Sequence, residues 1–194
     1  LHQKRLHHIK FKGAIFTNFS QDHLDYHKTM KSYLKAKLLL FKEILGKKST
    51  IITDKQIKPF FILKRIARKK NFKLLEIDRE FEKIQDFSSN FTSDFKIKNL
   101  AMAIKAAKLC NLNEKLIYKA IKKIKDVNGR LELVRSYPNE TKVFVDYAHT
   151  PDALLKTLNH LKNNYGNKIT LVFGCGGERD EKKRPMMANI ANAI

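Results

Sequence analysis

The sequence is poor in residues that crosslink or interrupt a chain. It has no tryptophan, two cysteines, four prolines and seven glycines among 194 residues. Two cysteines cannot build the disulfide framework of a small secreted domain, and no low-complexity stretch indicates disorder. No apolar run approaches the roughly 18 residues of a membrane-spanning helix. We therefore expect a globular, cytoplasmic protein with no membrane partner.

Acidic residues are also scarce: 19 Asp and Glu stand against 40 Lys and Arg, giving a net charge of +21. Such an excess raises the possibility of a nucleic-acid partner. The lysines are, however, scattered along the whole chain, with no basic stripe interleaved with aromatic residues. We interpret them as solvated helix faces and expect no nucleic-acid partner, with a basic nucleic-acid-binding module kept as an alternative.

A phosphate-binding loop is missing as well. Nothing matches G-x-x-x-x-G-K-[ST] or G-x-G-x-x-G. The chain starts at Leu1 rather than at a methionine, and residues 193–194 fall within a helical pattern. We therefore expect an internal fragment of a longer protein.

Short apolar runs alternate with helical patterns, which favours an α/β fold. Strands are predicted at 13–16 and 49–53, and alternation at 87–95 predicts a strand or hairpin. After a break near 127, the apolar run 168–173 predicts a strand that leads through a glycine turn into a helix, the start of a Rossmann-like unit. The expected domains are 1–127 and 128–194.

The loop after the first strand reads Asp22-His23-Leu24-Asp25-Tyr26-His27. Imidazoles and carboxylates that follow a strand are good metal ligands. One alternative is a metal-dependent hydrolase that uses His23, Asp25 and His27. The other is a polar loop in which Asp25 caps the next helix.

A helix is predicted over 29–45, and it carries a lysine in an unusual place. Lys37 falls on its apolar stripe, between Leu34 and Phe41. A lysine on an inward face either extends its amine to solvent or has a chemical use.

A further polar motif, Asp146-Tyr147-Ala148-His149-Thr150-Pro151-Asp152, stands between a predicted strand and a helix. Strand ends in open α/β sheets are where ligands bind, and Asp146 could hold a ribose hydroxyl or a metal-bound water. Thr150 before Pro151 is also an ordinary helix N-cap, and both readings can hold together.

Four phrases in this order and spacing resemble the Mur ligase family. They are Phe16-Thr17-Asn18-Phe19-Ser20-Gln21-Asp22-His23-Leu24-Asp25-Tyr26-His27, Asn128-Gly129-Arg130-Leu131-Glu132, Asp146-Tyr147-Ala148-His149-Thr150-Pro151-Asp152 and Gly174-Cys175-Gly176-Gly177-Glu178-Arg179-Asp180. The family has a UDP-binding domain, a central ATPase domain and a C-terminal Rossmann-like domain. The chain resembles the later part of the central domain and the first part of the last.

The resemblance implies roles for individual residues. His23 would be a magnesium ligand, and Lys37 would react with CO₂ to form a carbamate whose oxygens help to hold a second magnesium ion. Burial suits this role because only a neutral amine attacks CO₂, and burial lowers a lysine pKa. Arg130, Asp146 and His149 would lie at the nucleotide.

Other substrate contacts are implied in the same way. Asn99 would contact adenine, although Lys96 stands where the family usually has asparagine. Gln3 and Arg5 would hold the UDP-muramoyl substrate, and Arg179 would clamp the carboxylate of the incoming amino acid.

The implied reaction uses ATP and Mg²⁺ to join a third amino acid, diaminopimelate or lysine, to UDP-MurNAc-L-Ala-D-Glu through an acyl phosphate, in peptidoglycan synthesis. We expect a monomer, and we expect the 194-residue chain alone to be inactive.

Overall fold

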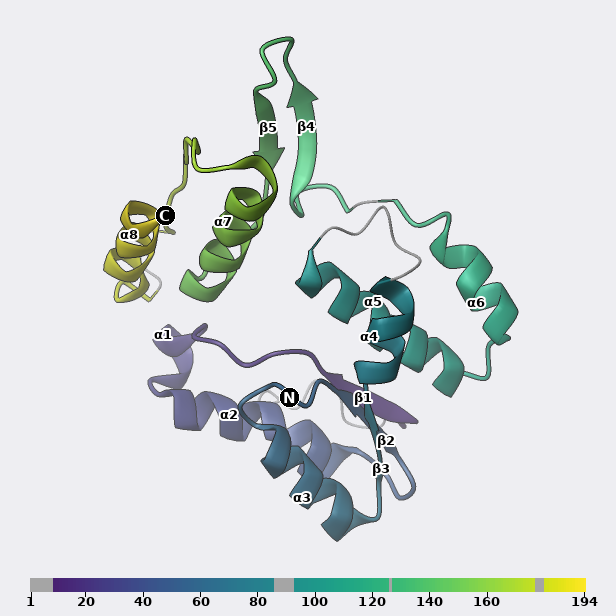
Figure 1. The fold of residues 1–194 in the computed structure, drawn as a ribbon. Coiled ribbons are helices and arrows are strands. Elements are labelled where there is room, and N and C mark those ends of the chain that lie inside the picture. Colours follow the sequence, from purple (N-terminus) through teal and green to yellow (C-terminus); the bar gives the residue numbers. More distant parts are fainter. Residues whose placement is uncertain (1–8, 86–92, 126, 177–179) are drawn as a thin grey trace. The chain divides into compact units, whose positions relative to one another are not determined.

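The computed structural model describes residues 9–85, 93–125, 127–176 and 180–194. The chain divides into two compact units. The first consists of Leu1–Phe19 with Lys31–Lys123, and the second of Ser20–Met30 with Ile124–Ile194. Figure 1 shows their helices and strands.

The first unit is built on a three-stranded parallel sheet with the order β1-β2-β3. Its strands are β1 (Gly13–Phe16), β2 (Thr50–Thr53) and β3 (Lys73–Glu76). The strands pair in register, with Ala14 opposite Ile51 and Ile52 opposite Leu75. Because parallel strands need crossover connections, their carboxyl ends meet at one edge of the sheet, where ligands of α/β proteins bind.

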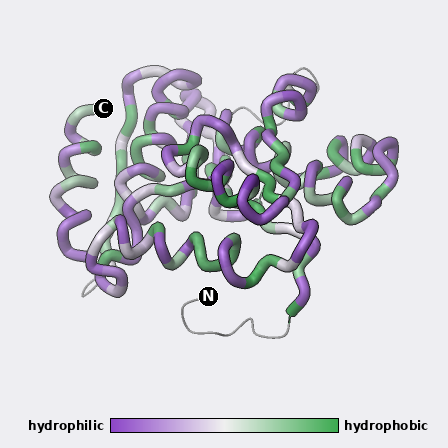
Figure 2. The backbone as a smooth tube through the Cα atoms, turned by 90° about the horizontal axis from the view of Figure 1, so that it is seen from below, coloured by the Kyte–Doolittle hydropathy of each residue, from purple (hydrophilic) through white to green (hydrophobic). Residues whose placement is uncertain are grey.

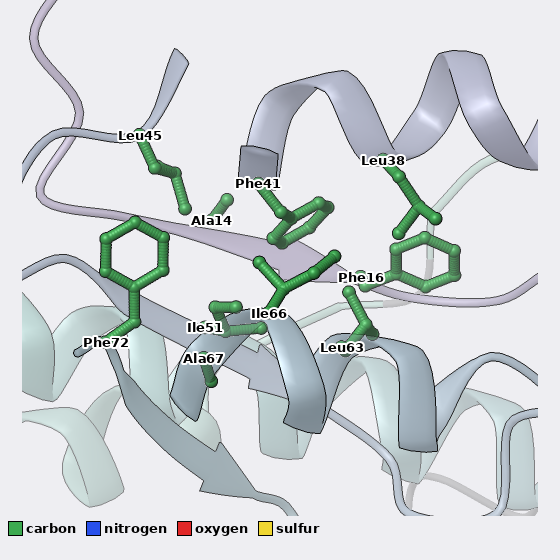
Figure 3. Close-up of a cluster of buried hydrophobic side chains, with 10 residues drawn as sticks. All are labelled: Ala14, Phe16, Leu38, Phe41, Leu45, Ile51, Leu63, Ile66, Ala67 and Phe72. Carbon is green, nitrogen blue, oxygen red and sulfur yellow. The ribbon is translucent and has the colours of Figure 1, made fainter. Parts of the chain in front are cut away.

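Helices cover both faces of this sheet, as an α/β sandwich requires. They are α2 (Met30–Leu39) with its π-helical last turn η1 (Leu40–Ile44), α3 (Phe60–Lys70), α4 (Asp78–Gln85), α5 (Asp94–Leu109) and α6 (Glu114–Ile121). One face of the sheet buries Phe16 and Ile51 among Phe41 of η1 and Leu63 of α3 (Figure 3). The next residue of β2, Ile52, points to the opposite face, because side chains alternate along a strand.

That opposite face has its own core. Ile52 packs there with Ile77, with Ile84 of α4 and with Ala101 and Ile104 of α5. All five are nearly inaccessible to solvent. The predicted α/β fold is therefore confirmed, although helix α4 was not predicted. The predicted strand or hairpin at 87–95 falls mostly outside the described residues, and its last two residues are helical.

Gly13 marks a close approach between β1 and its neighbours. A Cβ atom at this position would lie 2.5 Å from the Thr50 carbonyl oxygen and 2.7 Å from Leu109 Cδ2. We expect Gly13→Ala to lower the free energy of unfolding by about 1–3 kcal/mol, because the clash involves backbone that cannot move alone. Urea unfolding followed by circular dichroism measures the loss. Gly46→Ala is the matched control, since a Cβ there meets nothing within 4 Å; equal losses in both variants would contradict the steric explanation.

The second unit contains two strands and three helices among its described residues. These are α1 (Leu24–His27), the antiparallel pair β4 (Glu132–Ser136) and β5 (Lys142–Val145), α7 (Pro151–Tyr165) and α8 (Lys183–Ala193). Leu154 and Leu158 of α7 pack against Met187 of α8, which is fully buried. Figure 2 shows hydrophobic and hydrophilic residues alternating along the helices, the pattern that buries one helix face.

The prediction of a strand at 168–173 is wrong. These residues form no strand, and Val172 is 93% exposed. An apolar run becomes a strand only when a neighbouring strand pairs with it. β4 and β5 pair with each other, and no described strand pairs with 168–173.

Within the described ranges, no helix is both long and apolar enough to cross a membrane.

Candidate functional site

Lys37 lies in α2 with its amine among aromatic side chains of the first unit. Its Nζ donates a hydrogen bond to the Asn18 carbonyl oxygen at 3.4 Å. The same nitrogen lies 5.1 Å from the centre of the Tyr33 ring and 5.4 Å from that of Phe16, and both of these residues are buried. Lys37 itself is half-buried. The helix therefore turns this amine toward the end of β1 rather than fully into solvent.

The helix turn that follows Lys37 is unusual. The helix ends at Ile44, one residue before the predicted end, with Leu45 as its C-cap, and residues 40–44 form a π-helical turn. Phe41 in this turn is 2% exposed, and its ring centre lies 5.7 Å from that of Phe16. Single π-turns inside helices often occur at functional sites because they shift the side chains of one turn. Phe41 of this turn lies in the core against Phe16, the residue whose ring also faces the Lys37 amine.

His23, in the second unit, adopts a left-handed backbone conformation with φ of 55° immediately before α1. Asp22 holds it there: one carboxylate oxygen accepts the His23 backbone N–H at 2.9 Å, and the other lies 3.3 Å from His23 Nε2. Non-glycine residues adopt this conformation at a cost, and such strain clusters at functional sites. A carboxylate against one imidazole nitrogen is also the arrangement that orients metal-binding histidines.

These residues fit a magnesium site in part. His23 offers an imidazole oriented by Asp22, and a carbamate on Lys37 would offer oxygen ligands. The two residues belong to different units, so their pairing at one metal stays a prediction. Across the described part of the chain, no three or more His, Cys, Asp or Glu side chains are grouped to hold a metal. The hydrolase alternative built on His23, Asp25 and His27 therefore has no structural support, and Asp25 lies inside α1 rather than at a cap.

Arg130, Tyr147 and His149 form a row of stacked side chains in the second unit. The Arg130 guanidinium carbon lies 4.4 Å from the centre of the Tyr147 ring. The His149 ring meets the Tyr147 ring edge-on, with 5.0 Å between centres. His149 Nδ1 also lies 3.0 Å from the Tyr147 carbonyl oxygen. The structure thus brings together two of the residues predicted at the nucleotide and adds Tyr147.

Asp146, the third of these residues, is engaged with its own chain. One of its carboxylate oxygens accepts the Leu131 backbone N–H at 2.7 Å. The other accepts the Ala148 N–H at 2.8 Å and the Thr157 hydroxyl at 3.3 Å. Its predicted contact with a ribose hydroxyl stays a prediction. The N-cap at Thr150 is confirmed, because its hydroxyl accepts the Ala153 N–H at the start of α7.

Asn99 is exposed on α5 and is not among the residues that line the small cavity at the carboxyl edge of the sheet. The cavity encloses about 140 Å³ and is lined by Asp54, Gln56, Ile77, Asp78, Phe81, Asp94 and Lys98. Asp54 is buried, and its carboxylate lies 2.7 Å from the Lys98 amine. The adenine contact of Asn99 stays a prediction. Asp54 was missed, although an aspartate directly after an apolar strand could have drawn attention to it.

Three of the predicted substrate residues, Gln3, Arg5 and Arg179, lie outside the described residues. Their roles therefore rest on the motif resemblance alone.

A second charged cluster, also missed, joins α4, α5 and α6. Glu80 is buried; its carboxylate accepts hydrogen bonds from the Lys108 amine and the Tyr118 hydroxyl, each at 2.8 Å. Burial alone would raise the pKa of Glu80, but these two hydrogen bonds and the charges of Lys108 and Lys105 outweigh it, so the pKa is lowered. The same network raises the pKa of Lys108 against the opposing effect of burial, through Glu114 and Glu80. The cluster helps to fix α5.

Comparison with known proteins agrees with these features. The Mur ligase middle domain matches residues 1–107, and the Mur ligase glutamate ligase domain matches residues 129–194. Each unit by itself has the mixed α/β character of the domain that it matches. The chain belongs to the Mur ligase family.

Individual relatives carry a common name. The UDP-N-acetylmuramoyl-L-alanyl-D-glutamate–2,6-diaminopimelate ligase of Rickettsia bellii is 38% identical over 217 residues, covering all of this chain and 45% of that protein. The ligase of the same name from Aquifex aeolicus is 36% identical, covering 98% of this chain and 42% of its own length. A solved structure with this name is 26% identical, with a TM-score of 0.61 over 99% of this chain and 44% of that one. The chain thus spans less than half the length of these relatives.

Proposed function

We propose that the protein containing this chain is an ATP-dependent ligase that adds a diamino acid to UDP-MurNAc-L-Ala-D-Glu in the cytoplasm, as a monomer. The observation that carries this proposal is the match of both ligase domains, in order, to one chain, together with the printed name shared by its relatives from Rickettsia bellii and Aquifex aeolicus. Those names favour diaminopimelate over lysine as the third amino acid. The predicted domain boundary near residue 127 belongs to the same proposal.

In the proposed reaction, the γ-phosphoryl group of ATP passes to the D-glutamate carboxylate, giving an acyl phosphate. The amine of the diamino acid then attacks the acyl carbon, and phosphate leaves. Catalysis of this kind depends chiefly on positioning and on stabilising charge. Arg130 supplies a guanidinium that can pair with phosphate oxygens in two parallel hydrogen bonds. Asn99 and His149 would contact the rest of the nucleotide.

His23 and a carbamate on Lys37 are the residues of this chain that would hold magnesium. The ion would neutralise charge on the phosphate oxygens. Asp22 would keep the His23 imidazole oriented, and Asn18 and the Tyr33 ring would keep the Lys37 amine in place. Gln3 and Arg5 would hold the UDP-muramoyl substrate, and Arg179 the carboxylate of the amino acid.

Phosphate release tests the activity directly. We expect the full-length protein, with ATP, Mg²⁺ and UDP-MurNAc-L-Ala-D-Glu, to release phosphate when diaminopimelate is added and to form a product whose mass includes that amino acid. Lysine in place of diaminopimelate is the matched comparison. The purified 194-residue chain should release none, because it carries no phosphate-binding loop. Full-length protein that binds the substrates but forms no amide with either amino acid would refute the proposal.

A further inference from the structure

We propose that Tyr147 is a positioning residue for Arg130. Its ring stacks against the Arg130 guanidinium, and the Asp146 carboxylate fixes the backbone of the next residue, Leu131, by a hydrogen bond. This inference rests on the proposed function, because it assumes that Arg130 binds the phosphates of ATP. It assigns to Tyr147 a role that its motif alone did not suggest, and gives Asp146 a second role besides any contact with ribose.

The backbone beside Arg130 is strained, and Asp146 holds the strain in place. Leu131 has a φ of 48°, in the left-handed region that leucine rarely adopts. Its side chain is 5% exposed, and its N–H donates to Asp146 at 2.7 Å. Asp146 is itself fixed by Ala148 and Thr157. A conformation of this kind persists only where surrounding contacts determine it, and here they set the direction in which Arg130 leaves the chain.

The next residue after Asp146 then supports the Arg130 side chain. Arg130 and Tyr147 are both exposed, and without a support an exposed arginine would sample many rotamers. The Tyr147 ring restricts this freedom by stacking against the guanidinium at 4.4 Å. His149 also contacts the Tyr147 ring, edge-on, with 5.0 Å between the ring centres. A guanidinium stacked in this way keeps its N–H groups directed outward in its own plane, where they can bind phosphate.

A second arginine–tyrosine pair in the same unit offers a matched control. Arg135 stacks on Tyr137, with 4.7 Å from the guanidinium carbon to the ring centre, outside the motif that contains Asp146. In the full-length ligase, we expect Tyr147→Leu to raise the KM for ATP by about threefold to tenfold. The KM for the amino acid should not change. Tyr147→Phe, which keeps the ring, and Tyr137→Leu should leave both values unchanged.

Each other outcome has a distinct meaning. Arg130→Ala should raise the KM for ATP by at least about tenfold. If it does so but Tyr147→Leu does not, the positioning role is overturned and the proposed function stands. If Arg130→Ala has no effect, the assignment of Arg130 within the proposed function fails first. If Tyr147→Leu and Tyr137→Leu raise the KM values for both substrates equally, the stack has only a structural role and the inference is wrong.

Discussion

Replacing Lys37 by alanine is expected to reduce ligation by the full-length protein by at least about a thousandfold. The amine lies beside Asn18, Phe16 and Tyr33, and if it carries a carbamate, the variant loses the two oxygens that would help to hold magnesium. Lys37→Arg should be equally inactive, because a guanidinium keeps the positive charge over the rings but does not form the carbamate. Turnover is measured by phosphate release with saturating substrates.

Chemical rescue separates the carbamate from packing. A short carboxylic acid such as acetate offers two oxygens in the space that alanine leaves, so we expect it to restore part of the activity of Lys37→Ala but none of that of Lys37→Arg. ¹³C NMR of the wild-type protein with labelled bicarbonate should show a carbamate carbon that is absent from both variants. Lys35→Ala, an exposed change on the same helix, serves as the control. Unchanged turnover in Lys37→Ala would remove Lys37 from the metal site.

The rings around Lys37 set a physical condition on this chemistry. Aromatic faces stabilise a cation, whereas only the neutral amine reacts with CO₂. A carbamate must therefore gain more from its own contacts, magnesium among them, than the ammonium ion gains from Phe16 and Tyr33. We expect the carbamate signal to strengthen when Mg²⁺ and nucleotide are both added.

Local patterns were sufficient to predict much of the first unit. The strand at 13–16, the helix that ends within one residue of Leu45 and the inward direction of Lys37 follow from apolar spacing alone. The π-helical turn does not, because it depends on how Phe41 fits beside Phe16 in the finished core. Helix α4 was missed since its sequence, DREFEKIQ, is dominated by charged residues, and one of those charges becomes buried only through tertiary pairing.

For the candidate site, too, the sequence predicted some residues but not their contacts. Motif order indicated Arg130, Asp146 and His149, but not that Asp146 would bond to Leu131 or that Tyr147 would stack on Arg130. Both contacts join residues 15 or more positions apart, and no periodicity encodes them. The apolar run 168–173 shows the opposite failure, since its local pattern was clear but the pairing partner on which a strand depends is absent from the described residues.

Glu80 is a buried carboxylate whose loss should destabilise the first unit. Its carboxylate receives the Lys108 amine and the Tyr118 hydroxyl, and the Lys105 amine lies 3.9 Å away. Removing the carboxylate would leave the Lys108 amine with Glu114 alone and would take away the carboxylate that faces the Lys105 amine. Breaking a buried ion pair from one side in this way is costly, because the remaining charges stay desolvated.

We expect Glu80→Ala to lower the free energy of unfolding by about 2–4 kcal/mol at pH 7, measured by urea denaturation of the 194-residue chain. Glu82→Ala, a change at an exposed position on the same helix, should shift the free energy of unfolding by no more than about 0.5 kcal/mol.

The stabilisation by Glu80 should also depend on pH with a definite sign. Because the pKa of Glu80 in the folded state lies below its ordinary value of 4.5, its stabilisation is complete above that value and is lost as the pH falls through the lowered folded-state pKa. The difference in unfolding free energy between wild type and Glu80→Ala should therefore become smaller at acidic pH. If this difference stays constant from pH 7 to strongly acid conditions, Glu80 stabilises the unit through packing rather than through its charge.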